Sequence, residues 1–346
     1  MQHNLCLLPF DEASKKLNDN CLYIIGNGFD LAHGVKSSYY DFEKTIGKNN
    51  PLKLCLNLLI RKPDIWGNLE ENIAFLDREG VIGTVDDCID MFDLKEIGDE
   101  DFSYADFYAA KEHCTYFANE IKKSLPHRLR MWVETLKPDY TKRSLLKDII
   151  KQESLFINFN YTEFLETLYY ISKNNILYIH GDRRNKKETL VFGHGYSQEE
   201  LYDEWYEKNK NKKIDPNNAA SIGYFYNGNN PKVWKSATRY ELINQAIDDL
   251  EDYYYDSAKK TADVIKKNQE FFNELNNIFI IIVLGHSLSM VDYPYFRHII
   301  SQNGNPAKLI WYFSYYSEAD IQRISSFIQK FKIDSNKVRI FKIPTI

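Results

Sequence analysis

The stretch Cys21-Leu-Tyr-Ile-Ile-Gly-Asn-Gly-Phe-Asp-Leu-Ala-His-Gly34 decides the fold that we expect for this chain. Its first five residues are mostly apolar and end at a glycine, which predicts a buried parallel strand over 21–25. Gly26 and Gly28 allow a sharp turn after this strand and let a ligand approach the main chain. If a helix begins near Phe29, its free N–H groups and the positive end of its dipole suit a phosphate.

The glycine spacing differs from that of the common dinucleotide-binding fingerprint. The third glycine of that fingerprint would fall at position 31, which is Leu31, and the next glycine of the chain is Gly34. A strand followed by Gly-x-Gly also occurs in plain structural turns that bind nothing. The motif alone therefore leaves both a ligand-binding loop and a simple turn open.

Length and composition are those of a globular protein that buries a full core. The chain has 346 residues, of which 44% are apolar and 27% are charged. Its 25 tyrosines and 21 phenylalanines suit core packing, with stacking on a nucleotide base as the alternative. The net charge of −5 argues against a dedicated nucleic-acid surface, and we interpret the basic run at 208–213 as a solvated loop.

The spacing of the cysteines and the length of the apolar runs indicate the cellular compartment in which we expect the protein. The five cysteines form no Cys-x-x-Cys pair and none follows Cys114, so we expect neither a zinc site nor a disulfide framework. The N-terminus has no signal-peptide pattern, and no run approaches the roughly 18 apolar residues of a membrane span. These observations predict a reduced, soluble, cytoplasmic protein with no metal and no membrane partner.

Apolar periodicity along the chain predicts alternating strands and helices. Further strands are expected at 155–159, 176–179, 189–192, 278–284, 309–313 and 338–343. Helices are expected at 29–42, 51–61, 66–76, 104–125, 163–171, 238–275, 293–301 and 319–331, with an acidic loop at 86–101. The pattern predicts one α/β domain over 1–346, built on a Rossmann-type, mostly parallel sheet with helices on both faces. Two helical insertions are expected, at 44–150 and 196–276.

Chemically useful residues follow five of the predicted strands, at the ends where open α/β sheets bind ligands. They are Gly26–Asp30, Asn158 with Asn160, His180, Gly193–Gly195 and Gly285–Ser287. Each alone has an ordinary explanation, since an asparagine there often caps a helix and a histidine often just leaves the core. Together they predict a small-molecule site.

These segments resemble the AbiH family, bacterial proteins that act in abortive infection against phage. The resemblance covers most of the chain in the same order. It rests on Gly26–Gly34, Trp66–Glu70, Phe159–Thr162, Ile179–Gly181, Tyr255–Thr261 and Leu284–Phe296.

A more distant resemblance is to sirtuins and to the sirtuin-like defence proteins that consume NAD. It rests on the Gly28-to-Gly34 separation, Asn160–Thr162, His180-Gly181, Val191–His194 and Gly285–Leu288. The chain departs from sirtuins at Thr162, where an Asp near the nicotinamide pocket is expected. It also lacks the four-cysteine zinc module, which argues against deacylation and leaves water as the acceptor.

The second resemblance implies that NAD is a substrate or ligand and that its nicotinamide–ribose bond is hydrolysed. Asn160 would hold the ribose or a water, and His180 would accept a proton near neutral pH. The residues expected to bind the nucleotide are Gly26, Asn27, Gly28, Phe29, Asp30, Tyr161, Gly193, His194, Gly285, His286, Ser287 and Asp292.

Other interpretations remain open. The same pocket would serve a nucleotide or ADP-ribose sensor that signals infection to a partner without turnover. A nuclease has less support, because no basic face or carboxylate cluster stands out. A metal site built from His33, His180, His194, His286 and Asp292 has no diagnostic spacing. The resemblance to sirtuin-like defence proteins also implies a homo-oligomer and a phage-derived trigger.

Overall fold

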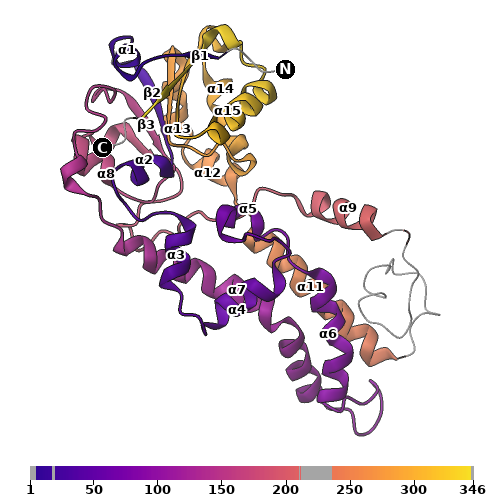
Figure 1. Cartoon of the computed structure of the whole chain (residues 1–346). Helices are drawn as coiled ribbons and strands as arrows, with labels where there is room; N and C mark the ends of the chain where they lie inside the picture. The colour runs from indigo at the N-terminus through magenta and orange to yellow at the C-terminus, as the bar shows by residue number, and fades with distance from the viewer. Residues whose placement is uncertain (1–4, 18–19, 210, 212–235, 344–346) are drawn as a thin grey trace. The chain divides into compact units, whose positions relative to one another are not determined.

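The structure, a computed structural model, describes residues 5–17, 20–209, 211 and 236–343 (Figure 1). The chain forms two compact units, and each is built from separate stretches of sequence. The first unit contains Met1–Phe42, Leu129–Val191 and Lys260–Ile346, and the second contains Glu43–Arg128 and Phe192–Lys259. In the described part of the chain, no helix has the length and apolar character needed to cross a membrane.

A seven-stranded sheet organises the first unit, and all of its neighbouring strands are parallel. Its order is β1-β7-β6-β5-β2-β3-β4. The strands are β1 (Cys6–Leu7), β2 (Cys21–Ile25), β3 (Leu155–Asn158), β4 (Ile176–Tyr178), β5 (Ile280–Leu284), β6 (Ile310–Tyr315) and β7 (Val338–Lys342). The predicted α/β class is therefore confirmed, and the sheet is entirely rather than mostly parallel.

The strand order identifies the place where such a sheet binds ligands. From β4 to β7 it is the order 3-2-1-4-5-6 of the doubly wound dinucleotide-binding fold, with β1 added beyond β7. The chain runs outward from β2 to β4 and then returns to β5 on the other side of β2. The carboxyl ends of β2 and β5 therefore flank the topological switch point.

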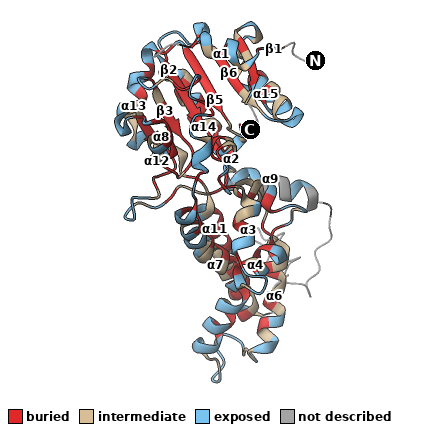
Figure 2. Cartoon of the chain, turned by 60° about the vertical axis from the view of Figure 1, so that its left-hand side comes forward, coloured by how far each residue is buried: buried red, intermediate tan, exposed pale blue. Residues whose placement is uncertain are grey.

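Helices cover both faces of the sheet (Figures 1 and 2). On one face lie α13 (Gln269–Asn273), α14 (Tyr293–Gln302) and α15 (Glu318–Phe331), whose buried aromatic side chains belong to the same core cluster as the strands. The other side carries α1 (Phe10–Lys15), α2 (Asn27–Ala32) and α8 (Phe164–Tyr169). The strands in between are almost wholly buried, as the continuous apolar runs of the sequence require.

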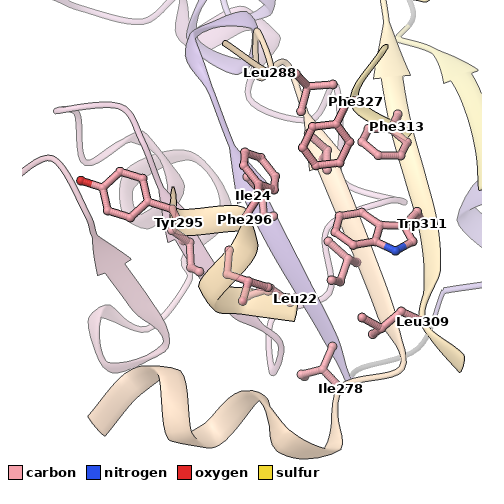
Figure 3. Close-up of a cluster of buried hydrophobic side chains, with 14 of the residues drawn as sticks. Leu22, Ile24, Ile278, Leu288, Tyr295, Phe296, Leu309, Trp311, Phe313 and Phe327 are labelled. Atoms are coloured by element: carbon pink, nitrogen blue, oxygen red, sulfur yellow. The ribbon is translucent and has the colours of Figure 1, made fainter. Parts of the chain in front are cut away.

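Figure 3 shows the core on the first of these faces. The Trp311 and Phe313 rings of β6 stack with their centroids 5.7 Å apart, and both contact Phe327 of α15. Leu22 and Ile24 extend from β2 into the same cluster, since alternate residues of a strand share a face. Burying each of these side chains stabilises the fold by about 1.5–3 kcal/mol.

The second unit is helical. Its elements are α4 (Pro51–Leu59), α5 (Leu69–Asn72), α6 (Arg78–Met91), α9 (Gln198–Asn209), α11 (Ala237–Ser257) and most of α7 (Tyr104–Thr135), while α3 (Tyr39–Thr45) spans its first boundary. Arg239 of α11 pairs with Asp86 of α6 at 2.6 Å between Nε and Oδ1. Two further ion pairs, Lys111–Asp249 and Lys122–Asp256, join α7 to α11.

Three of the predicted helices are wrong in their bounds. The helix predicted over 29–42 is two, α2 and α3, because the chain turns at Gly34, where φ is +74°. Pro126 does not end the helix predicted over 104–125. Instead α7 continues to Thr135, since buried Leu129, Trp132 and Val133 keep its apolar stripe packed. The helix predicted over 238–275 breaks after Ser257 and resumes as α12 (Thr261–Lys267) and α13.

Two predicted non-helical segments and one strand are also wrong. Part of the acidic loop predicted at 86–101 is helical, because α6 extends to Met91 with Val85 and Cys88 buried. The first 20 residues, a polar segment in which we predict no element, contain β1 and α1. No strand forms at 189–192; instead the Val191 N–H donates to the carbonyl of His180. The basic run at 208–213, which we interpreted as a solvated loop, begins at the end of α9, and its residues 210, 212 and 213 lie outside the described residues.

Candidate functional site

The loops after β2 and β5 meet at the switch point through their backbones. The Gly28 N–H donates to the carbonyl of Gly285 at 2.7 Å, and the Gly26 N–H donates to that of Leu284 at 2.9 Å. A Cβ on Gly26 would lie 2.4 Å from the Cα of His286, and one on Gly28 would lie 2.6 Å from the Cα of Gly285. Glycine is needed here because one main chain approaches another.

This packing changes the role that the sequence suggested for the glycine loop. The N–H of Phe29 donates to the carbonyl of Gly26, so three N–H groups of this turn already have acceptors within the protein. They are not the groups that would hold a diphosphate. Asn27 after β2 and Ser287 after β5 are exposed beside the switch point, and the Asn27 amide also donates to the carbonyl of Ser37 at 2.9 Å.

Asp30 is the centre of a buried polar network between α2 and the end of β3. Its two carboxylate oxygens accept hydrogen bonds from the Asn160 amide at 3.0 Å and from the Thr162 hydroxyl at 2.7 Å. The same Asn160 amide also donates to the carbonyl of Gly26 at 3.1 Å. The side chain to which we assigned a catalytic role thus ties the glycine turn to β3.

Burial raises the pKa of Asp30 to about 7, and the hydrogen bonds from Thr162 and Asn160 oppose this rise only in part. The carboxyl group therefore changes charge in the physiological range. A buried group that titrates near neutrality is suited to proton transfer, and such groups are concentrated at functional sites.

A second cluster lies at the ends of β4 and β5 and consists of His180, His286 and Asp292. We call it the His–Asp–His triad. The Asp292 carboxylate lies between the two rings, with Oδ1 3.5 Å from Nε2 of His180 and Oδ2 3.4 Å from Nε2 of His286. All three side chains are at most 7% exposed.

Aromatic rings enclose the triad. The Phe159 ring lies with its centroid 5.0 Å from that of His180 and 4.4 Å from that of His286. Tyr295 of α14 lies 5.8 Å from His180, and the partly buried Tyr161 lies 6.3 Å from it. Figure 3 shows the Tyr295 hydroxyl pointing away from the labelled core side chains. Apolar walls of this kind strengthen electrostatic interactions inside the cluster.

Two of the predicted binding residues, Gly193 and His194, belong to the second unit. There His194 pairs with the end of α11, since its N–H donates to the carbonyl of Ser257 and its carbonyl accepts from the N–H of Lys259. The Lys259 ammonium is fully buried and lies 2.9 Å from Oε2 of Glu70. Glu70 of the family-like segment Trp66–Glu70 and Lys259 of the segment Tyr255–Thr261 therefore meet in this unit.

The described residues contain no group of three or more His, Cys, Asp and Glu side chains that could hold a metal ion. The surroundings of the histidines agree with this. His33 bonds the Phe29 carbonyl and the Tyr169 hydroxyl instead of joining the triad. Nδ1 of His286 accepts from the Leu288 N–H, so its Nε2 carries the proton and has no lone pair for a metal.

Sequence reasoning missed Phe159, Tyr295 and the actual role of Thr162. Thr162 drew notice only as a replacement for an expected Asp, whereas its hydroxyl hydrogen-bonds Asp30. The signal that could have identified it is its place in the four-residue run Phe159–Thr162, all of which lies at the end of β3. Asn158 shapes this run, accepting from the Asn160 N–H and donating to the Thr162 carbonyl.

The chain was compared with known proteins. Neither a curated protein nor a solved structure matched it. A protein-family model described as "Bacteriophage abortive infection AbiH" matches residues 22–315, a range that includes the glycine loop, the Asp30 network and the triad. Since the match extends over most of the 346 residues, the chain belongs to the AbiH family of bacteriophage abortive infection proteins.

Proposed function

We propose that this phage-defence protein is an effector that binds a nucleotide at the carboxyl ends of β2 and β5 and hydrolyses it at an N-glycosidic bond. NAD, through its nicotinamide–ribose bond, or a related nucleotide would be the substrate. The observation that carries the proposal is the presence of two groups suited to proton transfer, Asp30 and the His–Asp–His triad, beside the switch point of a dinucleotide-type sheet.

The chain's residues suggest a division of roles. Asn27 and Ser287, exposed on either side of the switch point, would contact phosphate or ribose oxygens. His180 would transfer the proton, and Asp30 with Asn160 would position the ribose or the attacking water. Bound nucleotide supplies a bond whose cleavage passes through an oxocarbenium-like state, which a site stabilises by electrostatics and orientation.

A sensor that binds the nucleotide without turnover is the second candidate. This candidate is favoured because the predicted catalytic side chains already make polar contacts with other groups of the protein. The Asn160 amide already bonds Gly26 and Asp30, and both ring nitrogens of His180 face protein oxygens. A sensor would bind NAD or ADP-ribose and pass the change to a partner or to further copies of this chain, after a phage-derived trigger.

His180→Ala is expected to abolish turnover, because it removes the proton-transferring ring. The measurement is chromatographic: purified protein is incubated with NAD, ATP and ADP-ribose, and nicotinamide, adenine and ribose products are followed. His127→Ala, which removes an exposed histidine, is the matched control and should retain full activity.

Thermal unfolding of each variant shows whether lost activity reflects lost structure. Full activity in a stable His180→Ala protein would contradict the assignment of this site. Thermal stabilisation by NAD or ADP-ribose without product release would support the sensor. Neither release nor stabilisation would remove the reason for calling this a nucleotide-binding protein.

A further inference from the structure

The orientation of the Asn160 side-chain amide is fixed by two acceptors. Its nitrogen donates to the carbonyl oxygen of Gly26 at 3.1 Å and to Oδ1 of Asp30 at 3.0 Å. A primary amide nitrogen carries two N–H groups, and these two acceptors account for both. The reversed orientation would place the amide oxygen against two other oxygens, so repulsion would replace both hydrogen bonds.

This orientation does not depend on the charge of Asp30. The Gly26 carbonyl has only lone pairs, so the amide atom beside it is the nitrogen in either charge state. Oδ1 of Asp30 accepts from the same nitrogen, which leaves Oδ2 as the position for a proton on this carboxyl group. Oδ2 lies 2.7 Å from the Thr162 hydroxyl, which can accept as well as donate. Asp30 therefore holds the amide whether it is ionised or protonated.

The main chain that carries Asn160 is held on both sides. The N–H of the preceding residue, Phe159, donates to the carbonyl of Ile25 at 2.9 Å and so continues the pairing of β3 with β2. The N–H of Asn160 donates to Oδ1 of Asn158 at 3.0 Å, and the Asn158 amide donates to the carbonyl of Thr162 at 3.0 Å. Rotation of the side chain is the remaining freedom, and the two acceptors of the amide nitrogen restrict it.

The oxygen is the part of this amide that remains for a ligand. The Asn160 side chain is largely buried, and the residue keeps 7% of its surface exposed. Within the described residues no donor bonds the amide oxygen, and it is not among their buried polar atoms without a partner, so it reaches the solvent. An amide oxygen only accepts. The group that it meets must therefore donate, as a sugar hydroxyl does and a phosphate oxygen or a carbonyl does not.

The place of Asn160 in the sheet indicates which donor this is, a step that rests on the proposed function. In doubly wound dinucleotide-binding sheets, a carboxylate about 20 residues after the glycine loop, at the end of the next strand, accepts from a ribose hydroxyl. Here the next strand is β3, which lies beside β2. Asn160 follows β3, 130 positions after Asp30, because the second unit interrupts the chain between them. Its oxygen is the acceptor at the equivalent strand end.

We propose that Asp30 is a positioning residue that holds the Asn160 amide with its oxygen toward the ligand, and that this oxygen selects ribonucleotides by accepting from a free sugar hydroxyl. A deoxynucleotide that lacks this hydroxyl has no proton to donate there and leaves the oxygen unpaired. Asp30 itself is 2% exposed and acts through Asn160.

Exchange of the side-chain amide protons, followed by nitrogen-15 NMR, tests the orientation in the free protein. We expect both Asn160 protons to exchange about tenfold or more slowly than those of Asn174, an exposed asparagine of the same unit. In Asp30→Ala one of the two protons should lose this protection. Asp30→Asn should restore it, because the introduced amide oxygen accepts in the same place. Asn160 protons that exchange as fast as those of Asn174 in the unmodified protein would overturn the proposal.

Equilibrium binding of paired nucleotides tests the selection. The probes are ATP with its 2′-deoxy and 3′-deoxy forms, and NAD with analogues that lack the same hydroxyls on the nicotinamide ribose. We expect one of the two deletions to weaken binding about tenfold, because it leaves the Asn160 oxygen without a donor. Asp30→Ala should bring the parent and deoxy forms toward equal affinity, and Asp30→Asn should restore the preference. Asp11→Ala, which removes an exposed carboxylate of α1, should keep the preference of the unmodified protein.

The two experiments separate the possible failures. Equal affinity of the unmodified protein for a parent nucleotide and both of its deoxy forms would overturn the selection while leaving nucleotide binding intact. Protected Asn160 protons without binding of any probe would overturn the proposed function, and the ligand assignment with it, but not the orientation of the amide. A preference that survives in Asp30→Ala would overturn the positioning role of Asp30.

Discussion

Gly285→Ala is expected to destabilise the first unit by about 2–5 kcal/mol, the sum of a backbone penalty and a steric one. Gly285 has φ of +65°, a conformation that other residues adopt at a cost. A Cβ there would also lie 2.4 Å from the Phe29 nitrogen and 2.5 Å from the Gly28 Cα. Both neighbours are main-chain atoms, so neither can rotate away.

Two other glycines of the chain separate these two contributions. Gly98 has φ of +105° but nothing within 4 Å of an added Cβ, so Gly98→Ala should cost only the backbone penalty, about 1–2 kcal/mol. Gly47 has open space and no positive φ, and Gly47→Ala should change stability by less than about 0.5 kcal/mol. Urea unfolding, with hydrogen exchange of the β5 amides as the local probe, measures all three. An equal cost at Gly285 and Gly98 would contradict the contact between the two loops.

Asp30 is expected to make the stability of the first unit fall as the pH rises from about 4 to about 7. Its pKa is about 7 in the folded protein because of burial, against 3.8 for the ordinary group. The folded state therefore holds one more proton than the unfolded state between these values. The stabilisation is fully present below about pH 4 and is lost as the pH rises through 7, a total of about 4 kcal/mol.

Asp30→Asn should remove this slope, since an amide does not titrate in that range. Its amide oxygen can accept from the Asn160 amide and its amide nitrogen can donate to the Thr162 hydroxyl, which also accepts, so stability at any one pH changes through hydrogen-bond geometry as well as through titration. The diagnostic quantity is thus the slope of unfolding free energy with pH, not its value. Asp11→Asn, at an exposed position of α1, should keep the slope. An unchanged slope in Asp30→Asn would show that another group titrates.

The fold was predictable where burial left a clear pattern. β2 and β5 are continuous apolar runs, and both were found to within two residues because a strand buried on both faces has no polar positions. Prediction failed where contacts between residues distant in the sequence determine the local structure. The run at 189–192 has a strand-like composition, yet it pairs with no strand in the described part of the chain, and the Val191 N–H donates to the carbonyl of His180 instead. β1, only two residues long, exists because β7 offers an edge.

The sequence predicted which strand ends form the candidate site, but not which side chains hydrogen-bond or pair with one another there. Alternation of strands and helices brings Asn160, His180 and His286 to one edge of a parallel sheet, and this follows from topology. The link between Asp30 and Thr162 spans 132 positions, and that between His180 and Asp292 joins different loops. No local periodicity encodes either pairing. Gly193 and His194 likewise belong to the other unit because the chain leaves the first unit after Val191 and returns to it at Lys260.

Because the first unit is built from stretches that lie far apart in the sequence, its sheet cannot be completed early in the synthesis of the chain. β2 pairs with β5 in a register that joins Ile25 to Leu284, 259 positions later. At translation rates of about 5–20 residues per second, the early strand and its glycine turn wait roughly 10–50 s for that neighbour. Until then the apolar surface of β2 and its unsatisfied backbone groups are open to other chains. A nascent protein of this kind therefore has a long window for chaperone capture, and a polypeptide ending before residue 280 lacks the strand that closes its central sheet.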